Sequence, residues 1–399
     1  MLQSRESSTA LLGLRGFYFL TYAGMGALFP FLSLLLQAHR LSPTETSWVM
    51  VAIPLGNLLV PPLWGIAADV LRARLLLLRV ACLGSGLCML LFLPRWQLAG
   101  WLVSMGLFAF FRSPVSALTD ASTVDALGGR DVGFSRIRLW GSVGFAVAAL
   151  GIGQLGPTSH PDRLVVTTAA IYFCAFLSTL PLRARSSPNP APVREGHVAQ
   201  RLGPLLLEPR FLLFLLGSAL HYLGHSTYDA YFGLYAQGLG LGDALVGAAW
   251  AVGVAAEIGV MIVSPWLLGR VSATALLCIG SAAAVVRWLL LSVTTGTIEL
   301  VVLQALHGLT FGLWFVSAVS FVQSRAPREL RTSLQSAAYS ALGLGTVAGY
   351  LGGGWVLEHH GGALLFRLAA GAAGAGLLCY LGTTLLPGPK SPPAVVPAR

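Results

Sequence analysis

Charged residues are scarce in this chain of 399 residues: they make up 10% of it, whereas an ordinary soluble domain carries about 25%. Hydrophobic residues make up 55%, and the mean hydropathy is +0.75. So few charged side chains could not cover a soluble protein of this length, which excludes a soluble enzyme, a nucleic-acid-binding protein and a disordered scaffold. The composition predicts an integral membrane protein whose partner is the lipid bilayer and not a nucleic acid.

Cysteine is also rare, and its pattern marks no site. The five cysteines lie in apolar runs, without a C-x-x-C pair or the spacing of a metal site, so we expect small core residues and no metal. The motifs G-x-S-x-G, the Walker loop and H-E-x-x-H are missing as well. We therefore expect no catalytic residue and no cofactor, and we expect any transport to draw on an ion gradient, that of protons, and not on ATP.

Apolar runs long enough to cross a bilayer, at about 20 residues per helix, recur along the chain. The first, from Leu11 to Gln37, is too long for a signal-peptide core and lacks a small-residue cleavage site, so it predicts a first transmembrane helix. Glycine and proline inside the runs are tolerated in membrane helices. We predict twelve spans, at residues 11–37, 45–67, 75–94, 98–121, 138–156, 164–182, 211–236, 243–267, 274–294, 298–322, 334–357 and 363–386.

One long polar stretch divides these spans into two equal sets. It covers residues 183–210 and follows the sixth span. The predicted organisation is an N-terminal half at 1–182, a cytoplasmic linker at 183–210, a C-terminal half at 211–386 and a cytoplasmic tail at 387–399. We expect the chain to act as a monomer.

Basic residues are distributed unevenly between the two sides. Alternate connections place 16 of the 25 on one side and three (Arg40, Arg95 and Arg163) on the other, while six fall within spans or at their edges. Cytoplasmic loops carry the excess of Lys and Arg. The count predicts a multi-pass protein of the cell (inner) membrane with both termini and the linker in the cytoplasm.

A faint repeat relates the two halves. The fifth span opens near Arg136 and the eleventh near Arg331, with similar residues 195 positions apart. Twelve helices in two six-helix pseudo-repeats around a cytoplasmic linker is an arrangement that resembles the major facilitator superfamily. The resemblance implies an all-α fold in which the solute binds at the midplane and rocking of the halves alternates access.

The loop after the second span carries a gate-like motif. Gly65, Asp69, Arg72 and Arg74 are similar to the cytoplasmic signature of that superfamily, although its usual basic residue after the acid is Val70 here. Gly65 would permit close helix approach, and Asp69 would pair with an arginine or cap a helix end. The alternative is an ordinary positive-inside loop.

Charges within spans are the main candidates for a site, since each costs about 2.5–3.5 kcal/mol at the bilayer centre on insertion scales. Both halves contain acids and bases, which could neutralise each other when buried. The alternative is that they form structural ion pairs only. The candidates are Arg112, Asp120, Asp125 and Arg138 in the N-terminal half and Asp229, Glu257, Arg287 and His307 in the C-terminal half.

Several dispersed motifs narrow the resemblance. They are Phe17–Phe19, Pro30–Phe31, Arg136–Phe145, Val254–Glu257, Val285–Trp288 and Gln304–His307. Together they look like the phenylpropionate permease family, a branch of proton symporters related to lactose permease. The resemblance implies a secondary transporter of a small organic solute, with an aromatic carboxylate as one candidate, and we place Tyr18 and Tyr22 among the solute-binding residues.

The spacing of the charges also resembles that of lactose permease. Asp120 and Arg138 have the 18-residue separation of its acid and arginine on helices 4 and 5, and Glu257, Arg287 and His307 match the order of its acid, arginine and histidine on helices 8 to 10. The resemblance implies that Asp120, Arg138, Arg287 and His307 bind solute. Its proton-carrying acid, one turn after the histidine, is replaced by Thr310, which leaves Glu257, with His307, as the candidate for proton coupling.

The seventh span presents aromatic residues on one face. His221, His225, Tyr228 and Phe232 follow one another at spacings of three and four. Such a face could stack on a planar solute, and Tyr228 is the solute-binding candidate; the alternative is an interfacial aromatic belt. The family resemblance suggests a structural pairing for the neighbouring Asp229.

Two other functions remain alternatives at this point. A drug or metabolite exporter of the same fold would carry a proline-glycine signature on helix 5, and the glycines there have no such proline. A membrane-embedded enzyme such as an acyltransferase would need a base at one membrane face, and His307 lies in mid-span.

Overall fold

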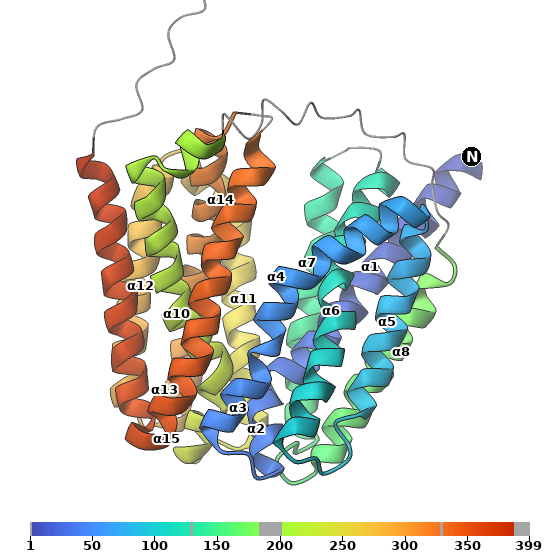
Figure 1. Cartoon of the computed structure of the whole chain (residues 1–399), viewed down its shortest axis with the longest axis horizontal. Helices are drawn as coiled ribbons and strands as arrows, with labels where there is room; N and C mark the ends of the chain where they lie inside the picture. The colour runs from blue at the N-terminus through green and yellow to red at the C-terminus, as the bar shows by residue number, and fades with distance from the viewer. Residues whose placement is uncertain (1, 128–130, 183–201, 328–329, 387–399) are drawn as a thin grey trace, which may run out of the picture.

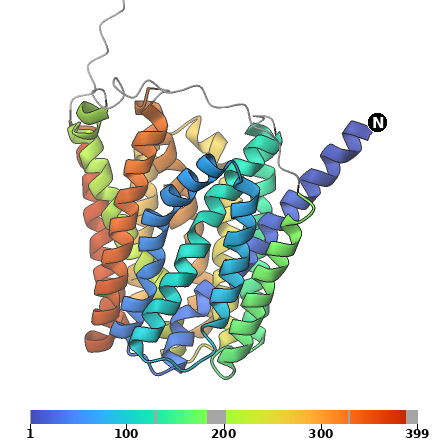
Figure 2. The same cartoon turned by 45° about the vertical axis from the view of Figure 1, so that its right-hand side comes forward.

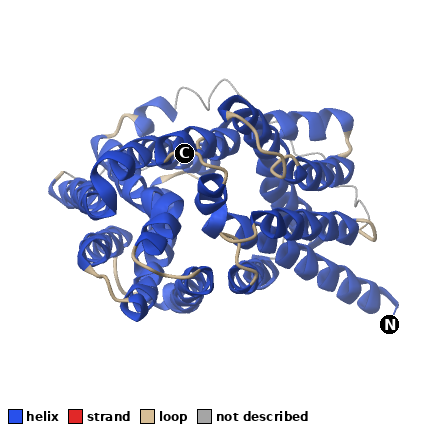
Figure 3. Cartoon of the chain, turned by 90° about the horizontal axis from the view of Figure 1, so that it is seen from below, coloured by secondary structure: helices blue, strands red, loops and turns tan. Residues whose placement is uncertain are grey.

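The computed structural model describes residues 2–127, 131–182, 202–327 and 330–386 of the chain. The side chains of residues 2–11, 69, 124–127 and 131–136 lie outside this description, and these include the candidates Asp69 and Asp125. Most of the predicted linker and the predicted tail also lie outside the described residues. Helices and loops make up all of the described residues, without a strand among them (Figure 3). Nine of the described helices are long and apolar enough to span a membrane, which confirms the predicted all-α polytopic fold.

The N-terminal half consists of six successive helical segments. Pro30 interrupts the first, because proline cannot donate a backbone hydrogen bond and starts a short 3₁₀ turn here. The segments are α1 (Leu2–Leu28) with η1 (Phe29–Phe31) and α2 (Leu32–Ala38), α3 (Pro43–Met50) with α4 (Ala52–Leu71), α5 (Arg74–Leu90), α6 (Leu98–Leu127), α7 (Asp131–Gln154) and α8 (Pro161–Thr179).

The C-terminal half has six segments as well. Gly361, with φ of 81°, breaks the longest helix into two, and this left-handed conformation suits glycine. The segments are α10 (Pro209–Gly238), α11 (Asp243–Leu268), α12 (Ala273–Val293), a composite of α13 (Thr297–Val302), η2 (Leu303–Leu306), η3 (Gly308–Leu313) and α14 (Trp314–Arg325), and the two parts of α15 (Arg331–Leu385).

Two equivalent turns relate the halves. Arg40 follows the first segment with φ of 69°, and Gly240 follows the seventh, 200 positions later, with φ of 92°. In each turn the next backbone N–H bonds to the carbonyl five residues before it, at 3.1 and 2.9 Å. The same helix termination at corresponding places supports two structurally related halves.

The halves pack against each other at one end of the bundle, which we call the closed end. It carries the loops at residues 39–42, 155–160 and 239–242, and the ribbons of the halves converge there (Figure 1, Figure 2). A Cβ added at Gly247 on α11 would lie 2.3 Å from the carbonyl oxygen of Ala149 on α7, and one at Gly354 on α15 would lie 2.5 Å from that of Pro43 on α3. Glycine permits this close approach of backbones.

Two polar clasps also join the halves at the closed end. In the first, a Glu358 oxygen accepts hydrogen bonds of 2.9 Å from the Ser42 hydroxyl and from the Thr44 backbone N–H, at the start of α3. In the second, the Asp243 carboxylate, at the start of α11, accepts from the backbone N–H of Thr158 at 2.9 Å. Toward the opposite end the ribbons of the halves diverge (Figure 1).

Candidate functional site

Arg287, on α12, is the centre of a buried polar cluster in the C-terminal half. Its side chain is 0% exposed. Nη1 donates to the Thr310 hydroxyl at 2.8 Å and to Nδ1 of His307 at 3.2 Å, and Nη2 donates to Oε1 of Gln304 at 2.5 Å. The guanidinium carbon lies 4.3 Å from the ring centroid of Tyr228. The direct partners of this buried cation are therefore neutral groups.

The distorted tenth segment positions three of these partners. The chain passes from a 3₁₀ turn at Leu303–Leu306 to a π-helical turn at Gly308–Leu313. A Cβ at Gly308 would lie 2.7 Å from the Ala256 carbonyl oxygen, so glycine allows this turn to pack directly on α11. Such π-turns occur frequently at functional sites. Here the distortion lets Gln304, His307 and Thr310 all reach one guanidinium.

His307 connects this cluster to Glu257 on α11. Nε2 of His307 lies 3.9 Å from Oε2 of Glu257. Since Nδ1 accepts a hydrogen bond from Arg287, the hydrogen-bonding pattern assigns the ring proton to Nε2, which faces the carboxyl. The side chains of Glu257 and His307 are 12% and 9% exposed, whereas that of Arg287 is 0% exposed, so the series of contacts runs from the partly exposed acid to the buried cation.

A second acid–histidine pair lies on α10. Nε2 of His225 is 3.6 Å from Oδ1 of Asp229, one helical turn away. His225 is buried and its Nδ1 has no hydrogen-bond partner, while the Asp229 side chain is 26% exposed. The rings of His225 and His307 lie 5.3 Å apart, so the two acid–histidine pairs are neighbours.

In the N-terminal half, the partner of Asp120 is a tyrosine. The Tyr18 hydroxyl donates to Oδ1 of Asp120 at 2.6 Å, and the rings of Tyr18 and Tyr22 stack with centroids 6.3 Å apart. Arg138 interacts electrostatically with Asp120 and both tyrosines. Among the described residues, however, no ion pair within 4 Å joins Asp120 to Arg138, so the two charges act on each other without direct contact.

Arg138 faces the other half of the protein. It is exposed, and it interacts electrostatically with Tyr339 on α15 and with Glu257 on α11. Tyr339 is itself 48% exposed. Arg138 lies at the start of the membrane span at Ile137–Gln154, and its charge acts on groups of both halves. Arg138 thus influences Asp120 of its own half and Tyr339 and Glu257 of the other half, and we call the region where these four side chains face one another the polar space between the halves.

The predicted aromatic face of the seventh span exists, but it packs inside the protein. Successive rings of His221, His225, Tyr228 and Phe232 lie 5.0 to 6.5 Å apart. All four side chains are buried, and His221 stacks on Trp314 at 4.5 Å. In this conformation the tenth segment and α12 cover the face, so stacking of Tyr228 on a solute stays a prediction.

The predicted gate residues lie at the end of α4. A Cβ at Gly65 would meet no atom within 4 Å, so the close helix approach expected there is not present in this conformation, in which the halves diverge at this end. Arg72 is exposed, with φ of 50° just after α4, and Arg74 begins α5. The side chain of Asp69 lies outside the described residues.

The structure thus brings the predicted residues into two groups. Tyr18, Tyr22, Asp120 and Arg138 form one, and Tyr228, Glu257, Arg287 and His307 form the other. Tyr18, Tyr228 and Arg287 are buried and contact protein groups in this conformation. Sequence reasoning missed Gln304, although it lies one turn before His307, and Tyr339, which carries no local signal because it approaches Arg138 from the other half.

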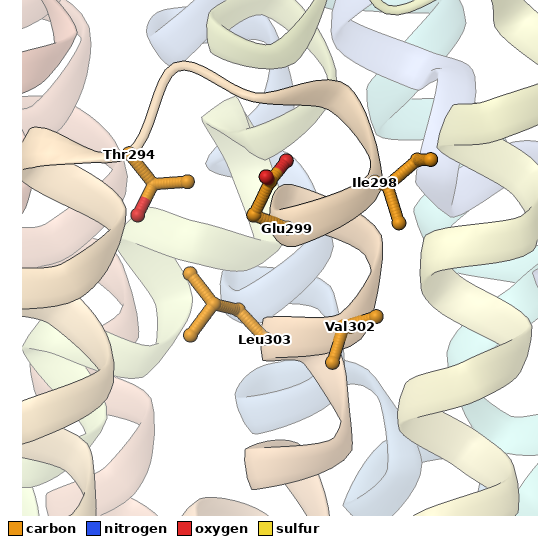
Figure 4. Close-up of a pocket in the computed structure, with 5 residues that line it drawn as sticks. All are labelled: Thr294, Ile298, Glu299, Val302 and Leu303. Carbon is orange, nitrogen blue, oxygen red and sulfur yellow. The ribbon is translucent and has the colours of Figure 1, made fainter.

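A shallow recess lies elsewhere, at the junction of α12 and α13 near the closed end. It is lined by Thr294, Ile298, Glu299, Val302 and Leu303 (Figure 4). Glu299 is its single charged lining residue, and none of the predicted site residues lines it. The recess is therefore distinct from the polar space between the halves.

The fold and its interior charges define a polytopic membrane transporter of small solutes. The family model described as the MFS_1 like family matches residues 11–368. The chain therefore belongs to this family of the major facilitator superfamily, whose members are transporters and not enzymes.

Curated relatives and solved structures agree with this assignment. The chain is 29% identical to a maltose permease of Geobacillus stearothermophilus, over 89% of this chain and 88% of that protein. It is 28% identical to a probable 3-phenylpropionic acid transporter of Escherichia coli, over 82% and 86%. The crystal structure of the nucleoside transporter NupG aligns with 95% of this chain and 100% of its own, with a TM-score of 0.83 at 17% identity. That last likeness shows the fold.

Proposed function

We propose that the protein takes up a small organic solute together with a proton, by alternating access. The observation that carries the proposal is the contact series from Glu257 through His307 to Arg287, opposite the exposed Arg138 of the other half. A carboxyl that is influenced by the guanidinium of Arg138 and contacts His307 can change its protonation when either group moves. That dependence is the physical requirement for coupling a proton to a conformational change.

Alternating access follows from the packing of the halves. Glycine contacts and the Glu358 and Asp243 clasps hold one end together, while Arg138 and Tyr339 remain exposed between the halves. Rocking of the halves would open the closed end and bring the two halves together at the opposite end. The gate residues Gly65, Asp69, Arg72 and Arg74 lie at that opposite end. In that second state the glycine at position 65 would allow the close approach that the gate motif requires.

We propose that the closed end faces outward. Arg40, Arg95 and Arg163, the three basic residues of the poorer side, lie in or beside the connections at this end, and the basic-rich connections belong in the cytoplasm. The conformation would then be open to the cytoplasm. In this orientation both termini and the linker at 183–210 would lie inside the cell. We also propose that the protein lies in the inner membrane and works as a monomer without a bound cofactor.

Two classes of solute fit the polar space. Arg138 could bind a carboxylate, as an aromatic acid such as 3-phenylpropionate would offer. The second candidate is a neutral, hydroxyl-rich solute, and the charge balance favours it: Asp120, Asp229 and Glu257 supply three carboxyls beside one exposed guanidinium, since Arg287 is buried. Carboxylates accept hydrogen bonds from hydroxyls and repel an anion.

Transport in proteoliposomes tests the proposal. Purified protein would be assayed with labelled 3-phenylpropionate, maltose and uridine, with and without an imposed pH difference. We expect accumulation of one of them that depends on the pH difference and disappears with a protonophore. In Glu257→Gln, which mimics a protonated carboxyl, solute exchange should survive and accumulation should fail. Accumulation by this variant would exclude Glu257 as the proton carrier, and accumulation indifferent to the pH difference would contradict proton coupling.

A further inference from the structure

We infer that Asp229, paired with His225, is a second holder of the transported proton, so that one proton is shared between Asp229 and Glu257. The inference rests on the proposed function and adds to it a residue outside the sequence-predicted coupling site. Its basis is the geometry of two acid–histidine pairs around one buried guanidinium, and the number of charges that face the space between the halves.

The two pairs have corresponding geometry. His225 Nε2 lies 3.6 Å from Asp229, His307 Nε2 lies 3.9 Å from Glu257, and the two histidine rings are 5.3 Å apart. Both carboxyls are partly exposed, at 26% and 12%, and both histidines are buried. In the first pair the carboxyl is much more exposed than the imidazole, at 26% against 3%. In the second pair the two side chains are exposed to a similar extent, at 12% and 9%.

One ring nitrogen of His225 lacks a hydrogen-bond partner, which is unexpected for a histidine with a purely structural role. Its buried Nδ1 has no hydrogen-bond partner, whereas both ring nitrogens of His221, one turn earlier, are occupied by Thr310 and Ser281. A buried polar atom without a partner is unfavourable. The neutral ring can therefore hold its proton on either nitrogen: with the proton on Nε2 it faces an ionised Asp229 as a donor, and with the proton on Nδ1 its Nε2 faces a protonated Asp229 as an acceptor.

Among the described residues, the surroundings of Asp229 supply one guanidinium, and no arginine or lysine lies within 4 Å of its carboxylate. From its own helix it faces His225, Tyr222 and Tyr228, from α12 Arg287, from α11 Glu257 and from α15 Tyr350. Arg287 already donates to three neutral acceptors, so it acts on Asp229 only through space.

Glu257 has a similar environment. It faces His307 from the tenth segment, Tyr222 and Asp229 from α10, and Arg138 from α7. The two carboxyls thus influence each other directly, and each also has a guanidinium nearby. Protonation of one would make ionisation of the other easier, because like charges close together disfavour each other.

Counting the charges gives the number of protons. Within this cluster two guanidiniums, Arg138 and Arg287, accompany three carboxyls, Asp120, Asp229 and Glu257, and the histidines are neutral in their present contacts. The buried Arg112 interacts instead with Cys82 and Tyr172 of the N-terminal half and is not counted. Uncompensated charge is costly in a membrane interior. The set is electrically neutral when it holds one proton. If either of the two proton-binding carboxyls, Asp229 or Glu257, is removed, the set of charges is neutral without a proton. Asp229→Asn should therefore abolish coupling as effectively as Glu257→Gln.

The test compares Asp229→Asn with wild type and with Asp162→Asn, a control that neutralises an exposed acid at the start of α8. Whichever of labelled maltose, uridine and 3-phenylpropionate the wild type accumulates would serve as the probe. We expect Asp229→Asn to retain equilibrium exchange, to lose pH-driven accumulation at least tenfold, and to lose the pH dependence of exchange. Asp162→Asn should behave as wild type.

The outcomes separate the inference from the proposed function. If Asp229→Asn accumulates the probe as the wild type does, Asp229 holds no transported proton and the inference is overturned. If the wild type itself accumulates no probe under a pH difference, proton symport fails and the inference falls with it. Should Asp229→Asn not fold, His225→Gln would be tested in its place, and an unaltered pH profile of exchange in that variant would overturn the inference.

Discussion

The guanidinium of Arg287 donates a 2.8 Å hydrogen bond to the hydroxyl of Thr310, which occupies the place of an acid in the lactose permease pattern. The buried guanidinium of Arg287 therefore has a neutral hydrogen-bond acceptor at a position where the lactose permease pattern has a carboxylate. This arrangement leaves its positive charge to act on Asp229 instead, and it makes the hydroxyl of Thr310 important for stability.

Thr310→Val should destabilise the protein by about 1.5–3 kcal/mol, the range for a hydrogen bond to a charged group, because Arg287 loses an acceptor that water cannot replace. Thr310→Ser should retain most of the stability. Unfolding of purified protein in detergent measures the change. Thr346→Val is the control, since the Thr346 hydroxyl bonds only a carbonyl of its own helix. Equal stability of the valine variants at 310 and 346 would contradict the prediction.

Arg138→Lys should weaken solute binding about tenfold or more, although it keeps the charge. The planar guanidinium offers several donors in a fixed fork, and an ammonium does not. Binding would be measured with the accumulated probe on purified protein. Arg95→Lys, in an exposed loop at the closed end, is the matched control and should bind as the wild type does. Unchanged affinity in Arg138→Lys would remove Arg138 from the solute site.

Tyr18 should stabilise Asp120 more than Arg138 does. The Tyr18–Asp120 hydrogen bond is 2.6 Å long, whereas Arg138 acts on the carboxyl from beyond 4 Å. A double-mutant cycle with Tyr18→Phe and Asp120→Asn should give a coupling energy of about 1.5–3 kcal/mol. The cycle with Asp120→Asn and Arg138→Gln should give less, while the double variant recovers expression lost in Asp120→Asn. A larger coupling in the second cycle would reverse this assignment.

The Glu358 clasp should weaken at acid pH. Hydrogen bonds from Thr44 and Ser42 lower the pKa of the Glu358 carboxyl below its ordinary value. A lowered pKa means that the contribution of the clasp is complete above the ordinary pKa and is lost as the pH falls through the lowered one. Acidification into that range should therefore favour opening of the closed end, as Glu358→Gln should at neutral pH.

Spin labels at cysteines replacing Arg95 and Glu299, one on each half near the closed end, would measure this opening by pulsed electron paramagnetic resonance. We expect the distance distribution to lengthen in acid and in Glu358→Gln. Gly247→Val serves as the positive control, since a Cβ there meets the Ala149 carbonyl at 2.3 Å. A distribution that lengthens in Gly247→Val but not in acid would show that Glu358 does not hold the halves together.

The pattern of apolar residues was sufficient to predict the helices, but it did not predict how some of them end or where one of them is distorted. The apolar runs predicted the segments because a helix in lipid must be apolar along its length. The equivalence of Arg40 and Gly240 was hidden, because an arginine occupies a left-handed position where glycine is the usual signal. The π-turn around Thr310 was hidden as well, since it depends on how closely Gly308 can approach α11.

The pattern of apolar and charged residues was enough to predict a polytopic helical membrane protein and to pick out the charged residues of the interior, because charge is too costly in a bilayer to occur there without a role. The partners of those charges became visible in the three-dimensional structure. In the structure Asp120 accepts a hydrogen bond from Tyr18, and Arg287 donates to neutral acceptors. The aromatic face of α10 is buried, and Asp229 lies beside His225. These contacts join residues on different helices, or depend on which face of a helix is covered, and spacing along one helix carries no information about either.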